Sequence, residues 1–237
     1  MASPDNYLEA CPLFMGVPLQ VIKQDCPSAK IESFPHGSVI YKQGQRLAEI
    51  FCVLDGQVKL ARLSRDGAEF TTALLANGEL FGASLNDAPA FEAPETATVK
   101  GEGNSLRVRV NEFRNLLLNH PTLGLRVVEL LDRRKQQMER RLECFAFKRT
   151  ESRLVETLRE LSGGFETRCE HGFGQHIRLS QQELADLVGA TRPVVSTILN
   201  RLRKEGVLGY TREYVCIREI EAIERILGLS PRPATVI

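Results

Sequence analysis

Short apolar runs separated by glycine make up most of the first half of the chain. Between Lys30 and Val110, runs such as 50–54 and 58–63 end at turn signals, of which Asp55-Gly56 is the clearest. Several short strands at regular spacing with turns of this kind are typical of an all-β barrel or sandwich. The pattern therefore predicts a β-rich domain that ends near residue 120.

The pattern changes to helical spacing at Asn111. This residue suits the cap of a short helix over 112–119, and Pro121 suits the first turn of a longer helix without a breaker before Lys148. Along the longer helix, side chains recur at alternating steps of three and four, all apolar except one lysine: Val128, Leu131, Lys135, Met138, Leu142 and Phe145. This is coiled-coil spacing and predicts a dimer interface, with packing on the chain's own β domain as the alternative.

Two short helices joined by a glycine turn are expected in the last third of the chain. Ser180 and Glu183 have the spacing of a capping box, in which each side chain accepts a hydrogen bond from the other residue's backbone N–H. Gly189-Ala190 breaks this helix, and Thr191-Arg192-Pro193 starts the next one with Thr191 as the expected cap. The arrangement is a helix-turn-helix. Two short apolar runs after Gly206 resemble the hairpin of a winged helix.

The second of these helices presents a polar face with almost no carboxylate. Hydroxyl, amide and cationic groups donate to base edges and phosphates, so we expect this segment to bind double-stranded DNA. An excess of basic side chains after residue 106 agrees with a polyanionic partner. The residues expected at the DNA are Ser180, Gln182, Thr191, Arg192, Ser196, Thr197, Asn200, Arg201, Arg203 and Lys204. The alternative is a ligand-binding module whose helical tail has a solvated face and serves protein contacts.

Composition narrows the class of protein further. The chain has 237 residues, of which 43% are hydrophobic, as in a soluble globular protein of one or two domains. No apolar stretch approaches the roughly 20 residues of a membrane helix, and no signal peptide is apparent. We therefore expect a cytoplasmic protein without membrane contact. The sequence shows no nucleophile–base group, phosphate loop or metal-ligand spacing, which argues against an enzyme and a metal site.

Taken together, these motifs resemble the CRP/FNR superfamily of bacterial transcription regulators, named after the catabolite activator and the fumarate-nitrate reductase regulator. The resemblance begins at Leu13-Phe14 and continues through glycines at positions 37, 44, 56, 67, 78 and 82. It is most specific in the stretch LSQQELADLVGATRPVVSTILNRLRKEGVL.

The resemblance implies an α+β protein with three parts. These are a cyclic-nucleotide-binding-like β-roll over 1–120, a dimerisation helix over 121–147 and a winged helix-turn-helix over 148–237. It implies a homodimer on a two-fold symmetric DNA operator. RNA polymerase is a further expected partner, with the glycine-rich loop 163–174 as its candidate contact.

The expected sensor pocket departs from the family members that bind cyclic AMP. Ala83 stands where these members have a ribose-binding glutamate, and Glu95 where they have a phosphate-binding arginine. Because a carboxylate repels a phosphate, we expect that cyclic AMP does not bind in the usual mode. By resemblance, the residues at the pocket are Phe81, Gly82, Ala83, Ser84, Thr96, Ala97, Arg134, Met138 and Glu139.

Several other effectors remain open. The 2-oxoglutarate-sensing nitrogen regulators resemble this chain at Phe81-Gly82, Arg134 and Glu139, but the second arginine expected near Glu95 is missing. Basic side chains on the long helix suit a larger anion such as a cyclic dinucleotide, and a regulator that needs no ligand is also possible.

Cysteine and histidine spacing bears on the cofactors. Cys11 and Cys26 are too few and too far apart for the family's iron–sulfur cluster, and the four histidines show no pairing for haem or zinc. The six cysteines, at positions 11, 26, 52, 144, 169 and 216, form no CxxC pair. We expect reduced thiols, with a thiol redox sensor as the alternative.

The expected DNA-reading helix also departs from the best-known family member. By resemblance, Arg192 takes the place of a guanine-reading arginine. Pro193 replaces a glutamate that accepts from cytosine, and Thr197 replaces a second arginine. We therefore expect one guanine contact to be kept and the rest of the half-site code to differ.

Overall fold

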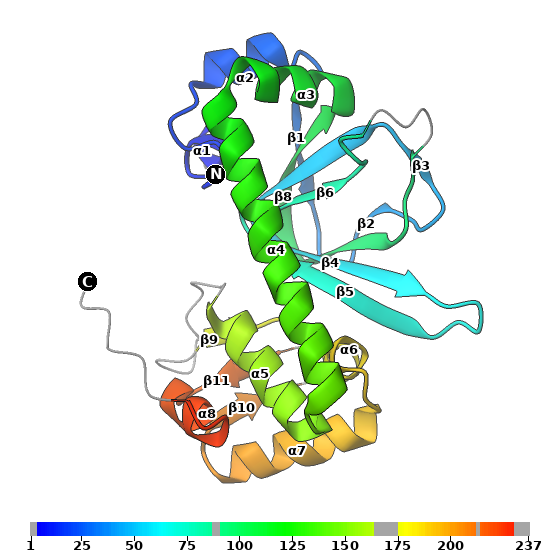
Figure 1. The fold of residues 1–237 in the computed structure, drawn as a ribbon, viewed down its shortest axis with the longest axis vertical. Helices are drawn as coiled ribbons and strands as arrows, with labels where there is room; N and C mark the ends of the chain where they lie inside the picture. Colours follow the sequence, from blue (N-terminus) through cyan, green and yellow to red (C-terminus); the bar gives the residue numbers. More distant parts are fainter. Residues whose placement is uncertain (1–3, 87–90, 164–174, 212–213, 230–237) are drawn as a thin grey trace. The chain divides into compact units, whose positions relative to one another are not determined.

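The computed structural model describes residues 4–86, 91–163, 175–211 and 214–229. The chain divides into two compact units, residues 1–136 and 137–237. Helix α4 (Pro121–Phe147) crosses this boundary, so its first part belongs to one unit and its last part to the other (Figure 1).

The first unit is built around a six-stranded antiparallel sheet with the core order β1-β8-β4-β5, in which β2 also pairs with β8 and β6 with β4. A separate pair is formed by β3 and β7. This architecture confirms the predicted β-roll. The strands are β1 (Lys30–Phe34), β2 (Val39–Tyr41), β3 (Arg46–Leu47), β4 (Glu49–Leu63), β5 (Glu69–Leu75), β6 (Leu80–Gly82), β7 (Phe91–Glu92) and β8 (Thr96–Arg109).

The predicted turn at Asp55-Gly56 is wrong, because β4 continues through it from Glu49 to Leu63. The register of β4 on β8 shifts on both sides of Asp55, so the glycine lies in a bulge within a long strand. Gly56 has φ +79°, and a Cβ there would lie 2.5 Å from the Glu102 carbonyl oxygen. Glycine is therefore required by both backbone conformation and space.

Three helices gather at one end of the roll: α1 (Pro4–Glu9), α2 (Leu19–Asp25) and α3 (Val110–Asn119) (Figure 1). Helix α3 begins two residues earlier than expected, with Arg109 at the N-cap position, so the predicted cap at Asn111 is wrong. The helices share a hydrophobic core with β4, β8 and the first part of α4, where Leu123 and Val127 are buried. A second core fills the roll around Tyr41, Phe51 and Phe81.

The second unit has the order of a winged helix-turn-helix, which confirms the predicted fold. Its elements are α5 (Thr150–Gly163), β9 (Gln175–Ile177), α6 (Gln181–Val188), α7 (Arg192–Lys204), β10 (Leu208–Tyr210), β11 (Val215–Ile217) and α8 (Ile220–Ile226). The three strands form an antiparallel sheet in the order β10-β11-β9. None of the helices in the described part of the chain has the length and apolar character needed to cross a membrane.

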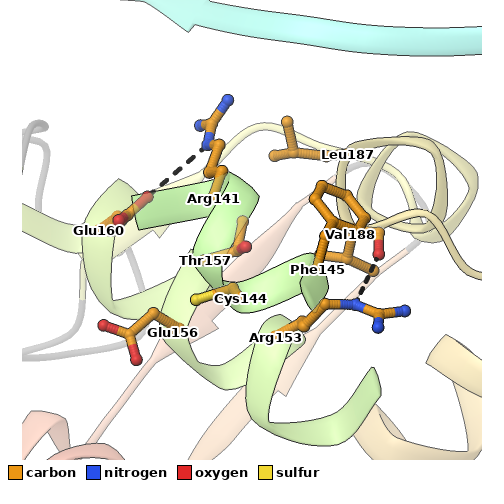
Figure 2. A pocket seen from close by; sticks show the side chains of 9 residues that line it. All are labelled: Arg141, Cys144, Phe145, Arg153, Glu156, Thr157, Glu160, Leu187 and Val188. Atoms are coloured by element: carbon orange, nitrogen blue, oxygen red, sulfur yellow. Dashed lines mark hydrogen bonds and ion pairs between the residues drawn. The ribbon is translucent and has the colours of Figure 1, made fainter. Parts of the chain in front are cut away.

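Gly189 forms the tight turn between α6 and α7, in the left-handed conformation with φ +60°. A Cβ at this position would lie 2.6 Å from Cε1 of Phe145. Figure 2 shows Phe145 beside Arg153, whose guanidinium lies 5.2 Å from the ring centroid and whose Nε donates to the Val188 carbonyl at 3.1 Å. The end of α4 thus packs on the turn of the helix-turn-helix.

We expect Gly189→Ala to destabilise the second unit by more than the ~1–2 kcal/mol that a left-handed alanine costs, because the methyl group also meets Phe145. Gly206→Ala is the matched control: its φ is +78°, but a Cβ there would have no described atom within 4 Å. Denaturant unfolding measures both. Equal losses in the two variants would contradict the contact between Phe145 and the turn.

Candidate DNA interface and sensor site

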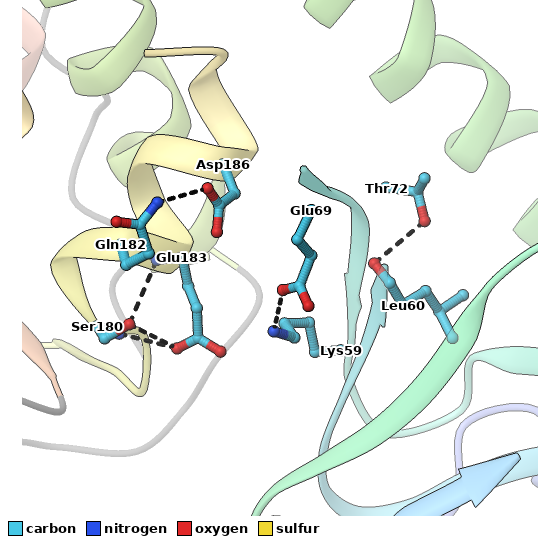
Figure 3. A network of polar contacts seen from close by, with 8 residues as sticks. All are labelled: Lys59, Leu60, Glu69, Thr72, Ser180, Gln182, Glu183 and Asp186. Atoms are coloured by element: carbon cyan, nitrogen blue, oxygen red, sulfur yellow. Dashed lines mark hydrogen bonds and ion pairs between the residues drawn. The ribbon is translucent and has the colours of Figure 1, made fainter. Parts of the chain in front are cut away.

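The predicted capping box at the start of α6 is confirmed. The Glu183 backbone N–H donates to Ser180 Oγ at 3.3 Å, and the Ser180 backbone N–H donates to Glu183 Oε2 at 3.0 Å (Figure 3). Gln182 donates from Nε2 to Asp186 Oδ1 at 2.8 Å on the same helix. These bonds fix the first helix of the pair, and they occupy part of the polar groups of Ser180 and Gln182.

Helix α7 has one buried apolar side and one outward side that is polar apart from Pro193 and Val194. Val195, Leu199 and Leu202 are completely buried, and Ile198 is nearly so. The side chains of the other face are exposed or half-buried: Arg192, Ser196, Thr197, Asn200, Arg201, Arg203 and Lys204. Thr191 occupies the N-cap position, but its side chain makes no capping hydrogen bond. The first backbone N–H groups of α7 therefore receive no hydrogen bond from the Thr191 side chain, which is exposed.

Thr197 and Arg201 on the polar side of α7 are already engaged within the protein. The Thr197 hydroxyl donates to the Pro193 carbonyl oxygen at 3.0 Å, one turn back along the helix. The Arg201 guanidinium hydrogen-bonds the Glu151 carboxylate on α5 through both terminal nitrogens and also lies 3.6 Å from Glu205. The bond to Glu151 raises the pKa of Arg201. Arg201 thus has its charge largely balanced before any partner arrives.

A residue that sequence reasoning missed joins the wing to α7. The Tyr210 hydroxyl, at the end of β10, donates to Asn200 Oδ1 at 2.7 Å. The Arg203 guanidinium lies 5.1 Å from the centroid of the same ring. Tyr210 is ten residues from Asn200 in another element, so no local spacing in the sequence relates the two.

Glu95 is held by the protein itself at the expected sensor site. Its Oε2 lies 3.7 Å from Nε of Arg62 and 3.3 Å from the Thr72 hydroxyl, whose single hydrogen is shared with the Leu60 carbonyl oxygen at 3.1 Å (Figure 3). The Glu95 side chain is only 16% exposed. Burial, followed by the nearby Glu95 charge, raises the pKa of the Tyr41 hydroxyl above its ordinary value. The Glu95 carboxylate therefore already has two polar neighbours within the roll, Arg62 and Thr72.

The other expected sensor residues divide between the two units. In the first unit, Phe81 and Ala97 are buried in the core of the roll, next to half-buried Ala83 and Ser84. Gly82 has φ +100°, and a Cβ there would lie 2.7 Å from the Glu49 carbonyl oxygen, so no side chain fits. Thr96 Oγ1 accepts from the Gln43 backbone N–H at 3.0 Å.

The long helix supplies the remaining three expected sensor residues. Arg134 donates from Nη1 to the Leu80 carbonyl oxygen at 3.0 Å, which ties α4 to β6 within the first unit. Met138 and Glu139 lie on the part of α4 that belongs to the second unit, and both are exposed.

Helix α4 carries two apolar stripes. Leu123, Val127 and Leu130 are buried in the first unit. The expected dimer residues Val128, Leu131, Met138 and Leu142 remain between 51% and 66% exposed, and Lys135 is exposed among them. Phe145, the last of that set, is 37% exposed because it packs on the Gly189 turn. The stripe that covers the β domain is therefore a different one from the predicted coiled-coil stripe.

The cysteines are reduced at four positions, as expected: Cys11, Cys26, Cys52 and Cys144. Cys216 on β11 is disulfide-bonded, so the expectation of reduced thiols is wrong for this residue. The sulfur atoms of Cys11 and Cys52 lie 3.8 Å apart in the helix–sheet core, and burial raises the pKa of Cys52. Burial likewise raises the pKa of Cys26 to about 12. Among the described residues, no three His, Cys, Asp or Glu side chains gather in a way that suits a metal ion.

The first unit is a β-roll that carries most of the expected sensor residues. The second is a winged helix-turn-helix whose second helix, α7, is polar and basic on its outward side. Together they define a DNA-binding regulator with two parts. Two family models match these parts: the cyclic nucleotide-binding domain over residues 31–120 and the Crp-like helix-turn-helix domain over residues 152–226. The chain belongs to the CRP/FNR superfamily and is a DNA-binding transcription regulator. Regulators of this family bind DNA and act as dimers.

Known relatives cover most of the chain. It is 28% identical over 220 residues to the cyclic AMP receptor protein of Thermus thermophilus, covering 92% of this chain and 98% of the relative. It is also 28% identical over 196 residues to the global nitrogen regulator of Synechocystis, covering 82% and 87%. These relatives are transcription regulators rather than enzymes.

A solved structure agrees with the fold. A CRP-family transcriptional regulator from Thermus thermophilus matches with a TM-score of 0.70 at 23% identity, over 86% of this chain and all of the other.

Proposed function

We propose that the protein acts as a homodimer that places α7 of each protomer in the major groove of a two-fold symmetric operator. The observation that carries this proposal is the division of α7 into a buried apolar side and a polar side with four cations and no carboxylate. Two recognition helices of a dimer then meet half-sites about one helical turn, or roughly 34 Å, apart. The residues we propose at the DNA are the ten predicted from the sequence.

The exposed stripe on α4 supports the dimer. Four large apolar side chains at coiled-coil spacing expose apolar area to water in the isolated chain, and a second copy of α4 covers them without rearranging the stripe that packs on the roll. Lys135 falls at a core position of the seam, where a polar residue fixes register.

Selection of bound duplexes from a random-sequence pool tests the proposal. We expect enrichment of a sequence with two-fold symmetry and half-sites one turn apart, each with a guanine at the position read by Arg192. Enrichment of asymmetric sequences, or of none, would overturn it.

The sensor site favours an effector other than cyclic AMP bound in the usual mode. Glu95 is a half-buried carboxylate already paired with Arg62 and Thr72, so a cyclic phosphate placed there meets a like charge and displaces existing bonds.

Isothermal titration at micromolar cyclic AMP should therefore give no heat of binding at this pocket. Glu95→Gln is the control, since it keeps the shape and removes the charge: if the carboxylate excludes the phosphate, this variant gains affinity relative to the wild type. Micromolar binding to the wild-type pocket would contradict the prediction.

Three other signals are proposed for the sensor domain: a dicarboxylate, a cyclic dinucleotide and thiol oxidation. Arg134 and the basic side chains that follow it suit a dicarboxylate or a cyclic dinucleotide, although Arg134 is held by the Leu80 carbonyl. The Cys11 and Cys52 thiols are close enough to form one S–S bond with hydrogen peroxide as the oxidant, their hydrogens leaving in two water molecules, but both are buried, so this oxidation requires local opening of the core. Native mass spectrometry of the purified dimer separates these signals by the mass that is gained or lost.

RNA polymerase as a partner and the cytoplasm as location are further proposals. The loop we expect to contact the polymerase, 163–174, lies almost entirely outside the described residues.

A further inference from the structure

We propose that Tyr210 in the wing is a positioning residue for DNA readout: it fixes Asn200 on α7 as a hydrogen-bond donor and holds Arg203 beside it. This inference rests on the proposed function of α7. It is carried by one aromatic side chain that contacts two polar residues of the recognition helix from outside that helix.

The hydrogen bond decides which group Asn200 offers to a partner. An amide side chain has one acceptor oxygen and one NH₂ group with two donors. Tyr210 occupies the oxygen with a 2.7 Å bond, so the NH₂ group is turned away from the tyrosine hydroxyl. The structure places the oxygen, not the NH₂ group, at the tyrosine hydroxyl; because this hydroxyl also accepts hydrogen bonds, an amide turned by about 180° would present its oxygen to the DNA instead, and the base preference distinguishes the two orientations.

A fixed donor selects a chemical class of ligand. Two N–H groups from Asn200 match acceptor edges in the major groove, above all N7 and O6 of guanine. The bidentate contact of a free amide with adenine needs the oxygen as well as the NH₂ group. The Tyr210 bond takes one of the two lone pairs of that oxygen and directs the oxygen toward the wing, so we expect Asn200 to favour guanine over adenine at the base pair it reaches.

The ring of Tyr210 has a second role that is separable from its hydroxyl. The Arg203 guanidinium lies over this ring at 5.1 Å, within the range of a cation–π interaction. Arg203 is exposed, and it follows Asn200 by three positions, on the same flank of α7. Ordering an exposed arginine in advance lowers the entropy cost of a phosphate contact, which acts on all sequences alike.

Tyr210→Phe tests the hydroxyl, because it keeps the ring over Arg203. On the selected operator, we expect affinity to fall between about twofold and tenfold, because the Asn200 side chain is then ordered only on binding. The preference for guanine over adenine at the Asn200 position should fall with it. Affinity for random duplex and the salt dependence should stay at the wild-type values, whereas the unfolding midpoint should fall slightly, because the hydrogen bond is also present in the free protein.

A double-mutant cycle with Asn200→Ala separates positioning from simple packing. If Tyr210 acts through Asn200, Tyr210→Phe has no further effect on operator binding in the Asn200→Ala background. Equal loss in both backgrounds, or equal loss on operator and random duplex, overturns the inference.

Tyr210→Leu completes the set by removing the ring as well. It should add a loss of similar size on every duplex, relative to Tyr210→Phe, because Arg203 is no longer held; no added loss overturns the role of the ring.

The failures of the two proposals are distinguishable. Wild-type protein without sequence preference defeats the proposed function, whereas a specific wild type that is indifferent to Tyr210→Phe defeats only the inference drawn from Tyr210.

Discussion

A protein that carries Leu131→Asp and Leu142→Asp should run as a monomer and should bind its operator roughly 10³-fold more weakly, the lower end of the usual gap between specific and non-specific binding. Both leucines lie in the exposed stripe of α4, at 51% and 66% exposure, and at core positions of the expected coiled coil. In a dimer, each aspartate would be buried against apolar side chains close to a second carboxylate.

The large effect follows from the way two half-sites combine. A monomer contacts the operator through one recognition helix only, because no partner protomer holds a second helix at the spacing of the other half-site. Sedimentation velocity measures the oligomeric state, and fluorescence anisotropy measures operator affinity.

Leu118→Asp is the matched control for the α4 pair. Leu118 is 75% exposed but lies on α3, outside the stripe. We expect this variant to stay dimeric and to bind DNA as the wild type does. A double aspartate variant that remains a dimer would show that the interface lies elsewhere.

Arg192→Ala should cost about 1–3 kcal/mol of operator binding and should relax sequence preference at one base position of each half-site. Arg192 is exposed at the first position of α7, where a side chain enters the groove first. Its guanidinium has the fork geometry that matches O6 and N7 of guanine. Affinity for duplexes altered at single positions measures both effects.

Lys204→Ala provides the comparison for Arg192→Ala. Lys204 is exposed in the last turn of α7, and a lysine there acts on phosphates as a point charge. Its loss should weaken binding to all sequences alike and lower the salt slope by about one. Equal weakening of operator and random duplex by Arg192→Ala would show that this arginine also contacts only the backbone.

Features set by neighbours in the sequence were the ones that could be predicted. The capping box needs only Ser180 and Glu183, three residues apart, and the structure has both bonds. The buried stripe of α7 follows from helical spacing alone. The glycine between α6 and α7 was predicted as a turn for the same reason, although its contact with Phe145 was not.

The wrong predictions concern features that other parts of the chain decide. Asp55-Gly56 has the local pattern of a hairpin turn, but β8 pairs with both sides of it and keeps β4 continuous. Asn111 is a good cap by residue type, but the backbone N–H of Val110 bonds the Ala48 carbonyl and the helix starts one residue before Asn111. In both cases tertiary pairing overrides local preference.

The polar contacts of the site were out of reach for a related reason. The partners of Arg201 and Asn200 are Glu151 on α5 and Tyr210 on β10, fifty and ten residues away. Residue type shows that such side chains are able to bind DNA, but only the packing of α5 and the wing against α7 shows which of their atoms are already engaged.

The most direct test of α7 as the DNA-reading helix is an anisotropy titration of the selected operator and a scrambled duplex over a series of salt concentrations. If α7 reads the operator, the operator binds at least about 10³-fold more tightly than the scrambled duplex, and log affinity for both falls linearly with log salt. Equal affinity for the two duplexes at every salt concentration would contradict it. So would failure to bind either duplex at low ionic strength, with and without candidate metabolites.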